Sequence, residues 1–263
     1  MRFTTNNAKW RKYHKTREEG EIIPANSTDE YSKNECGKKE IIVESEPDSQ
    51  ISVLFVKSAV EETAKLYGPI FTRMVSEYTL QFEAEKLKEK PPENIQGLDQ
   101  VTNYILANLD KYPKGYCSLM YAIGKAESQL QGSTGSGAKR SAYSAMKSII
   151  KASGMLNSII GTTEEVFEAL TKFEEIGKMV KTAIPLRFIG GKNNDVTMVT
   201  DKCPYKDACR AFVREGISRM VGGAECINII CHAAVSEIVT KKQFDYRLDE
   251  FDKPECKGRI FEV

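Results

Sequence analysis

Long apolar runs are absent from this sequence of 263 residues. No stretch approaches the roughly 18 to 20 apolar residues that a membrane-spanning helix needs. The first twenty residues also lack the apolar segment of a secretory signal peptide. We therefore expect no membrane span and a cytoplasmic protein.

The sequence also lacks an excess of charge of either sign. The sequence has 38 Lys and Arg residues against 37 Asp and Glu residues, which gives a formal net charge of +1. Proteins that bind nucleic acid usually show a basic excess, because they must neutralise phosphates. A nucleic-acid partner is therefore not expected from the composition.

Apolar side chains are scarce over residues 1–50. Lys, Glu, Asn and Ser dominate this segment, and its short apolar run is Ile41-Ile42-Val43. A segment of this composition buries too little surface to offset the entropy lost on ordering. We therefore predict a flexible polar tail over residues 1–50, docked at most through residues 41–43 and dispensable for folding. A single α+β ligand-binding domain is predicted over residues 51–263.

Residues 51–183 carry mostly helical periodicity. Apolar residues recur at helical spacing from Ser52 to Lys88, with a break at Gly68-Pro69, and this pattern predicts two helices. A segment that begins at Tyr116 is predicted to be a helix or a strand in the core. Further helices are predicted over 97–112, 139–160 and 162–182.

The period changes at Ile184. Alternating apolar and polar residues predict a hairpin followed by two more strands, with helices between them. Antiparallel strands with helices on one face make an α+β fold, in which a helical N-terminal part packs on a small sheet and the C-terminal region is rich in cysteine. The predicted strands are 184–190, 196–201, 244–252 and 256–263.

The segment GSTGSGAKRS is the one stretch that suggests a nucleotide. Gly132 and Gly137 have the separation of a phosphate-binding loop, but Ala138 stands where that motif needs lysine. The preceding segment is also amphipathic rather than a buried strand. We therefore predict that this segment is a connector and binds no nucleotide triphosphate.

Cysteines are concentrated at the C-terminal end. Five of the seven cysteines and one of the two histidines lie after Asp201. Disulfides suit small secreted domains, and single buried thiols are ordinary core residues, but neither explains such a concentration well. Thiolate and imidazole are the preferred ligands of zinc, and thiolates hold iron–sulfur clusters. The candidate metal ligands are Cys203, Cys209, Cys226, Cys231, His232 and Cys256.

The spacing of these residues excludes a standard zinc finger. Five residues separate Cys203 from Cys209 and four separate Cys226 from Cys231, whereas paired ligands usually have two to four residues between them. A site assembled from distant segments stays open. We predict that Cys203, Cys209, Cys231 and Cys256 bind zinc, with Cys226 or His232 as substitutes; an iron–sulfur cluster is the alternative.

The C-terminal layout resembles a known superfamily. The features are a hairpin leading to Cys203-Pro204, a helix opened by Cys226 and Cys231, and a last strand, CKGRIFEV, that begins at Cys256. They resemble the 4-vinyl reductase domain and the related 2-amino-thiazoline-4-carboxylic acid hydrolase-like proteins. The resemblance implies a pocket for an apolar or aromatic ligand between helices and sheet, with a cysteine-bound zinc beside it. Cys203 and Cys256 match the positions of metal-ligating cysteines in that family, and Cys226 and Cys231 match helix cysteines of the hydrolase-like branch.

Three functional hypotheses remain open. The first is a small-molecule sensor or carrier with a zinc site. The second is a metal- or cysteine-dependent hydrolase of a small heterocyclic or amide substrate. Cys231 and His232 are helix neighbours about 100° apart, so His232 would have to serve a cysteine on another element. The third is an iron–sulfur redox protein. Whether the protein is an enzyme, and whether it forms a homodimer, stays open.

Overall fold

The structure is a computed structural model that describes residues 32–33, 39–131, 136–191, 194–217 and 226–263. The elements below belong to one compact unit, residues 32–263. Among the described residues, no helix has both the length and the apolar character needed to cross a membrane.

Helices α2 to α5 share one hydrophobic core. Helix α2 (Ser49–Tyr67) begins at Asp48, whose side chain accepts a hydrogen bond from the Ile51 amide at 2.9 Å. Gly68 then adopts a φ of 77°, a left-handed conformation that costs glycine little, and α3 (Pro69–Leu87) starts directly after it. The predicted break at Gly68-Pro69 is thus confirmed. Helices α4 (Gly97–Ala107) and α5 (Tyr116–Gln131) complete this part, and residues 116–131 are a helix rather than a strand.

The remaining helices are α6 (Ser136–Ser153), α7 (Val166–Met179), α8 (Lys206–Arg214) and α9 (Ile227–Thr240). Helix α8 packs on α5 and extends the core of the first four helices through Phe212. Helices α6, α7 and α9 belong to a second core, which they share with the sheet. The helix expected over residues 139–160 ends at Ser153.

The sheet is antiparallel, and over the described residues its strand order is β1-β2-β3-β4-β6-β5. Its register places Phe188 opposite both Ile41 and Met198, and Met198 opposite Gly258. The fold is α+β, as predicted. The strands are β1 (Ser32–Lys33), β2 (Lys39–Val43), β3 (Leu186–Gly190), β4 (Val196–Thr200), β5 (Phe244–Glu250) and β6 (Cys256–Glu262).

Strand β2 lies within the segment that was predicted to be a polar tail. Strand β2 pairs with β3 from Glu40 to Val43, and Val43 is 2% exposed. Residues 41–43, through which the predicted tail was expected to dock, thus belong to a strand of the sheet. The apolar run of residues 41–43 is short. It suffices for a strand because β3 supplies the backbone hydrogen-bond partners and Val43 packs in the core.

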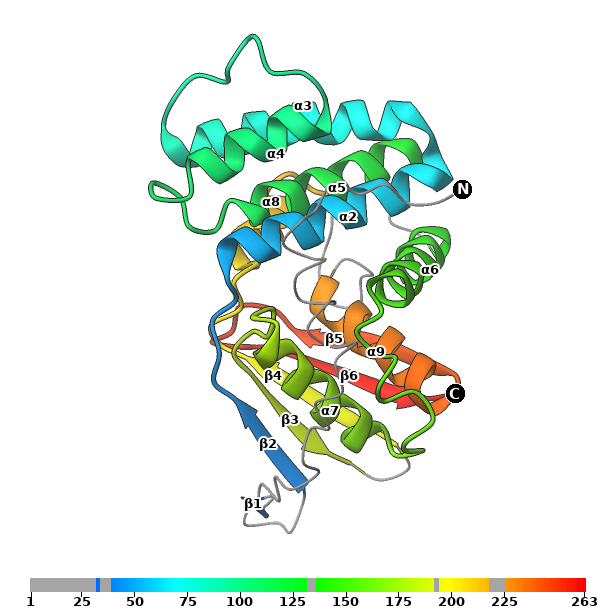
Figure 1. Cartoon of the computed structure of the whole chain (residues 1–263). Coiled ribbons are helices and arrows are strands. Elements are labelled where there is room, and N and C mark those ends of the chain that lie inside the picture. The colour runs from blue at the N-terminus through cyan, green and yellow to red at the C-terminus, as the bar shows by residue number, and fades with distance from the viewer. Residues whose placement is uncertain (1–31, 34–38, 132–135, 192–193, 218–225) are drawn as a thin grey trace, which may run out of the picture. The chain divides into compact units, whose positions relative to one another are not determined.

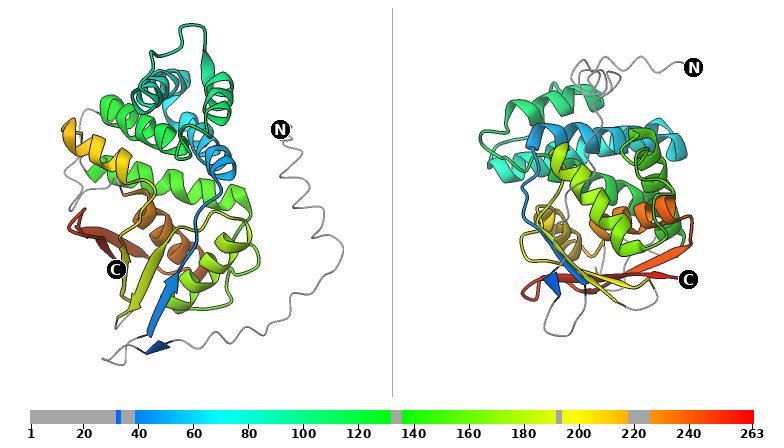
Figure 2. Two further views of the ribbon diagram at one scale, coloured as in Figure 1. Left: turned by 90° about the vertical axis from the view of Figure 1, so that its left-hand side faces the viewer. Right: turned by 60° about the horizontal axis from the view of Figure 1, so that its bottom comes forward.

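Helices α7 and α9 lie on one face of the sheet, with α2 to α5 farther from the strands on the same side (Figures 1 and 2). Helix α9 packs on β5 and β6 and also contacts α6 and α7. It lies close to β6 at Gly258, where the Cβ atom of any larger residue would clash with Ile229 Cδ1. The C-terminal strand pair is therefore tied to α9, and this contact positions the cysteine-rich segments.

Glu83 is an ionisable group inside the core of α2 to α5. It is fully buried, its Oε2 accepts a hydrogen bond from the Ser118 hydroxyl, and its Oε1 has no hydrogen-bond partner among the described residues. Burial raises the pKa of this carboxyl to about 7. As the pH falls, the folded state therefore takes up this proton at a higher pH than the unfolded chain does.

We predict that Glu83→Gln stabilises the protein at pH 8 more than at pH 5. A carboxyl group whose pKa is raised in the folded state stabilises the fold at pH values below its pKa in the unfolded chain. This stabilisation is lost as the pH rises toward 7. A neutral amide avoids burying the carboxylate that forms above that pH. The melting temperature of the variant should exceed that of the wild type by about 2–4 °C for each kcal/mol gained. Exposed Glu93→Gln is the control, and an equal gain at both pH values would contradict the interpretation.

We also predict that a chain starting at Ser52 is less stable than one starting at Ser32. The shorter chain lacks β2, so β3 loses its edge partner and the core loses Val43. Thermal unfolding followed by circular dichroism should show a melting temperature lower by several degrees. Equal melting temperatures would show that β2 adds nothing to the stability of the domain.

Candidate functional site

Four of the six candidate ligands line one cavity of about 20 Å³, which we call the cysteine cavity: Cys203, Cys209, Cys226 and Cys256. They come from four segments: the turn after β4, helix α8, the residue that caps α9, and the first position of β6. Cys256 pairs with Thr200 across β4 and β6, which brings the last strand next to the turn that carries Cys203. The sheet register and the packing of α9 on β6 thus assemble the cluster.

The cysteines in this cavity are thiols. Burial, together with the neighbouring Cys226 and Cys256, raises the pKa of Cys203 to about 12. Burial, together with neighbouring cysteines, raises the pKa of Cys209 well above its usual value. The Asn228 side-chain amide donates a hydrogen bond to Cys203 Sγ at 3.1 Å. Since the thiolate is the nucleophile in cysteine chemistry, protonated thiols of this kind are poor nucleophiles at neutral pH.

Four cysteines line one small space, and cysteine sulfur is a ligand that suits a soft metal ion. The present geometry is not that of a formed site. Within the described part of the chain, no group of three or more His, Cys, Asp or Glu side chains has the arrangement of a metal centre. A metal ion would therefore require the cysteine side chains to turn toward a common point.

Cys231 and His232 line a second, larger space, which we call the histidine cavity. Its volume is about 70 Å³, and it lies among α2, α6, α7 and α9. Of the four cysteines predicted to bind zinc, Cys203, Cys209 and Cys256 thus line the cysteine cavity, whereas Cys231 lines this second space. The apolar wall of the histidine cavity includes Phe55, Met146, Ile150, Met155, Phe173 and Ile184.

A buried hydrogen-bonded pair stands in the wall of the histidine cavity. His232 Nε2 lies 2.6 Å from Glu174 Oε1, and His232 Nδ1 lies 2.5 Å from the Asn228 carbonyl oxygen. Both side chains are 4% exposed. The imidazole ring is also held edge-on between the rings of Phe173 and Phe188, with centroids 5.6 and 5.3 Å away. The pair is therefore fixed in place by polar and aromatic contacts.

Glu174 and Asn228 were not among the residues predicted from the sequence. A signal for Glu174 exists: it lies four residues after Leu170 and three before Gly177, which are both buried. An acidic residue in the apolar stripe of an amphipathic helix needs a buried partner. Asn228 had no comparable signal, because its role depends on the approach of Cys203 from a distant turn.

The two cavities meet at the start of α9. Asn228 lines both, since its side chain contacts Cys203 and its carbonyl oxygen contacts His232. Tyr205 and Cys226 pack against both hydrophobic cores. The Cys117 thiol also donates to the Pro204 carbonyl oxygen at 3.1 Å, which ties the turn after Cys203 to α5.

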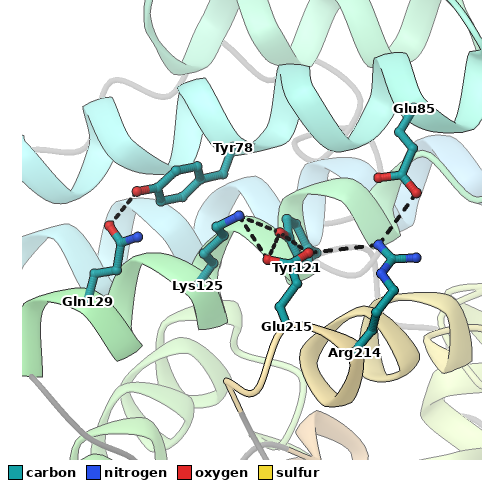
Figure 3. Close-up of polar contacts among 7 residues, drawn as sticks. All are labelled: Tyr78, Glu85, Tyr121, Lys125, Gln129, Arg214 and Glu215. Carbon is teal, nitrogen blue, oxygen red and sulfur yellow. Dashed lines mark hydrogen bonds and ion pairs between the residues drawn. The ribbon is translucent and has the colours of Figure 1, made fainter.

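A polar cluster lies at the end of α8 (Figure 3), and none of its residues lines either cavity. The Tyr121 hydroxyl donates to the Glu215 carboxylate at 2.7 Å, and Lys125 Nζ lies 2.9 Å from the same group. Burial, opposed by the Lys125 cation, raises the pKa of Tyr121 to about 12, so the hydroxyl keeps its proton. Arg214 reaches Glu85 on α3 at 3.5 Å. These contacts fasten α8 to α3 and α5, and we interpret them as structural.

The segment GSTGSGAKRS lies partly outside the described residues, which resume at Ser136. The prediction that it binds no nucleotide triphosphate therefore stays a prediction.

Comparisons with known proteins found no match. No protein-family model, no curated protein and no solved structure resembles the chain at a significant level.

Proposed function

We propose that the protein binds a small apolar or aromatic molecule in the histidine cavity. The observation that carries this proposal is the buried pair of His232 and Glu174 in the wall of an otherwise mainly apolar space. A buried polar pair costs desolvation and is weak support for stability. Binding sites, by contrast, commonly combine an apolar wall with a few polar groups that orient the ligand. The resemblance to the 4-vinyl reductase superfamily favours the same function.

The size of the cavity limits the ligand. Its volume of about 70 Å³ is about half that of a cavity of ~150 Å³ that accommodates benzene. A ring-sized ligand would therefore have to displace side chains. Met146 and Met155 line the space, and methionine adapts readily because its side chain is unbranched and flexible.

The geometry favours binding over hydrolysis. Both ring nitrogens of His232 are engaged, by Glu174 and by the Asn228 carbonyl oxygen, so neither is left to activate a thiol. Burial, together with the Glu174 carboxylate, raises the pKa of Cys231 to about 12. A protonated Cys231 beside an occupied imidazole lacks the features of a nucleophile and base pair.

For the cysteine cavity we propose a zinc ion held by Cys203, Cys209, Cys226 and Cys256. The supporting observation is that these four residues line one space although they come from four segments. Zinc bound by four cysteines serves a structural role, because it has no open position for a substrate. A space of about 20 Å³ holds roughly one water-sized sphere, so an iron–sulfur cluster, which contains several atoms, would need a much larger rearrangement.

The ligand proposal predicts that Ile150→Trp blocks binding. Ile150 lines the histidine cavity and is 3% exposed, so the larger tryptophan side chain at this position should fill the space. Indole and benzofuran serve as probes. We expect each to raise the melting temperature of the wild type and to have no effect on the variant, since a ligand stabilises only a state that binds it.

Ile160→Trp is the matched control, because Ile160 is 42% exposed and does not line the cavity. This variant should respond to the probes as the wild type does. Equal ligand-induced stabilisation of Ile150→Trp and the wild type would contradict the proposed location.

The zinc proposal predicts that Cys226→Ser lowers the zinc content while Cys231→Ser does not. The structure places Cys226 in the cysteine cavity and Cys231 in the other. Elemental analysis of protein purified without oxygen or chelator should find one zinc ion per chain in the wild type. Its loss in Cys226→Ser should lower the melting temperature, because metal binding is coupled to folding.

Cys117→Ser is the control, since Cys117 lies in the core of α2 to α5 and a serine hydroxyl can keep its hydrogen bond to Pro204. Metal-free protein whose thiols react only after denaturation would show that these cysteines are ordinary core residues.

A further inference from the structure

Glu174 has one oxygen that no described protein group satisfies. Its Oε1 is bound to His232, whereas its Oε2 is buried and has no hydrogen-bond partner among the described residues. Glu174 is 3% exposed and lines the histidine cavity. A buried oxygen without a partner costs about 1–3 kcal/mol. A molecule bound in the cavity can supply the missing hydrogen bond.

The role of Oε2 does not depend on where the proton of the pair resides. The Asn228 carbonyl oxygen only accepts hydrogen bonds, so His232 Nδ1 carries a proton. The contact between Nε2 and Oε1 then needs one further proton, on either atom. In both cases Oε2 carries none and acts as an acceptor. The bound molecule must therefore donate.

The charge of the ligand follows from the same proton count. With the proton on Nε2, the pair consists of an imidazolium and a carboxylate; with the proton on Oε1, both groups are neutral. The pair has no net charge in either form. A cationic ligand would thus enter an apolar space without a compensating charge, which is strongly unfavourable.

We propose, on the basis of the ligand-binding function inferred above, that the histidine cavity selects compact neutral molecules with an apolar ring and one N–H or O–H donor. Glu174 Oε2 accepts the hydrogen bond from this donor. The apolar side chains of Phe55, Ile150 and Phe173 contact the ring.

Indole and benzofuran test this selectivity in the wild-type protein. The two molecules have nearly the same shape, but only indole carries an N–H donor. Burial alone favours benzofuran, which is the more hydrophobic of the two. We expect calorimetry or ligand-observed NMR to show about fivefold tighter binding of indole, which is the scale of one neutral hydrogen bond. Pyrrole and furan provide the same comparison at a smaller size.

Two substitutions of Glu174 locate the acceptor. In Glu174→Gln, the amide can donate to His232 Nε2 and leave its carbonyl oxygen in the place of Oε2. This variant should therefore keep the preference for indole. Glu174→Leu removes the acceptor and should abolish the preference, provided that circular dichroism shows a folded protein. The comparison of probes in the wild type does not depend on either variant.

The outcomes separate this inference from the proposed function. Equal or tighter binding of benzofuran, blocked by Ile150→Trp, would overturn the donor requirement and leave the binding function standing. Tighter binding of benzylammonium than of indole, lost in Glu174→Gln, would overturn the requirement for a neutral ligand. No binding of any probe to the wild type would overturn the inference together with the proposed function.

Discussion

Burial of α9 is the constraint on which the rest of this structure depends. The helix contacts α6, α7, β5 and β6, and its side chains from Asn228 to Ile230 and from His232 to Ser236 are buried. Most of the surface of such a helix faces the protein interior, where polar groups are not hydrated. Its polar side chains must therefore find partners inside the protein, and these partners determine what surrounds the helix.

The polar residues of α9 meet this requirement with a period of four. The Ser236 hydroxyl donates to the His232 carbonyl oxygen at 2.8 Å, and the Thr240 hydroxyl donates to the Ser236 carbonyl oxygen at 2.7 Å. His232 Nδ1 continues the series at Asn228. The series satisfies each hydroxyl locally, but the second imidazole nitrogen of His232 needs a group from outside the helix. Glu174 on α7 supplies it, and a carboxylate thereby enters the core.

Particular residues show how far the sequence could predict this arrangement. The break at Gly68-Pro69 and the hairpin of β3 and β4 rest on local backbone preferences, and both are confirmed. Strand β2 was missed because its stability comes from pairing with β3, more than 140 residues later in the chain. The direction in which each cysteine points depends on its position along the helix. Cys226 caps α9 and Cys231 lies five residues later, and because a helix turns by about 100° per residue the two side chains point in different directions. The two therefore line different cavities, although Cys231 was predicted to bind zinc with Cys226 as a possible substitute.

A comparison of two buried glutamates shows why the histidine cavity, rather than any buried charge, is the site proposed for binding. Glu83 and Glu174 are both nearly inaccessible, and each has one oxygen without a partner among the described residues. Glu83 bonds to a neutral hydroxyl, and burial raises its pKa to about 7, so protonation can relieve the cost of its burial. It lines neither of the two cavities. Glu174 instead bonds to an imidazole, which shares its proton, and its remaining oxygen belongs to a residue in a cavity wall. The first arrangement is a stability cost within a packed core, whereas the second places an unsatisfied acceptor on a residue that lines a cavity.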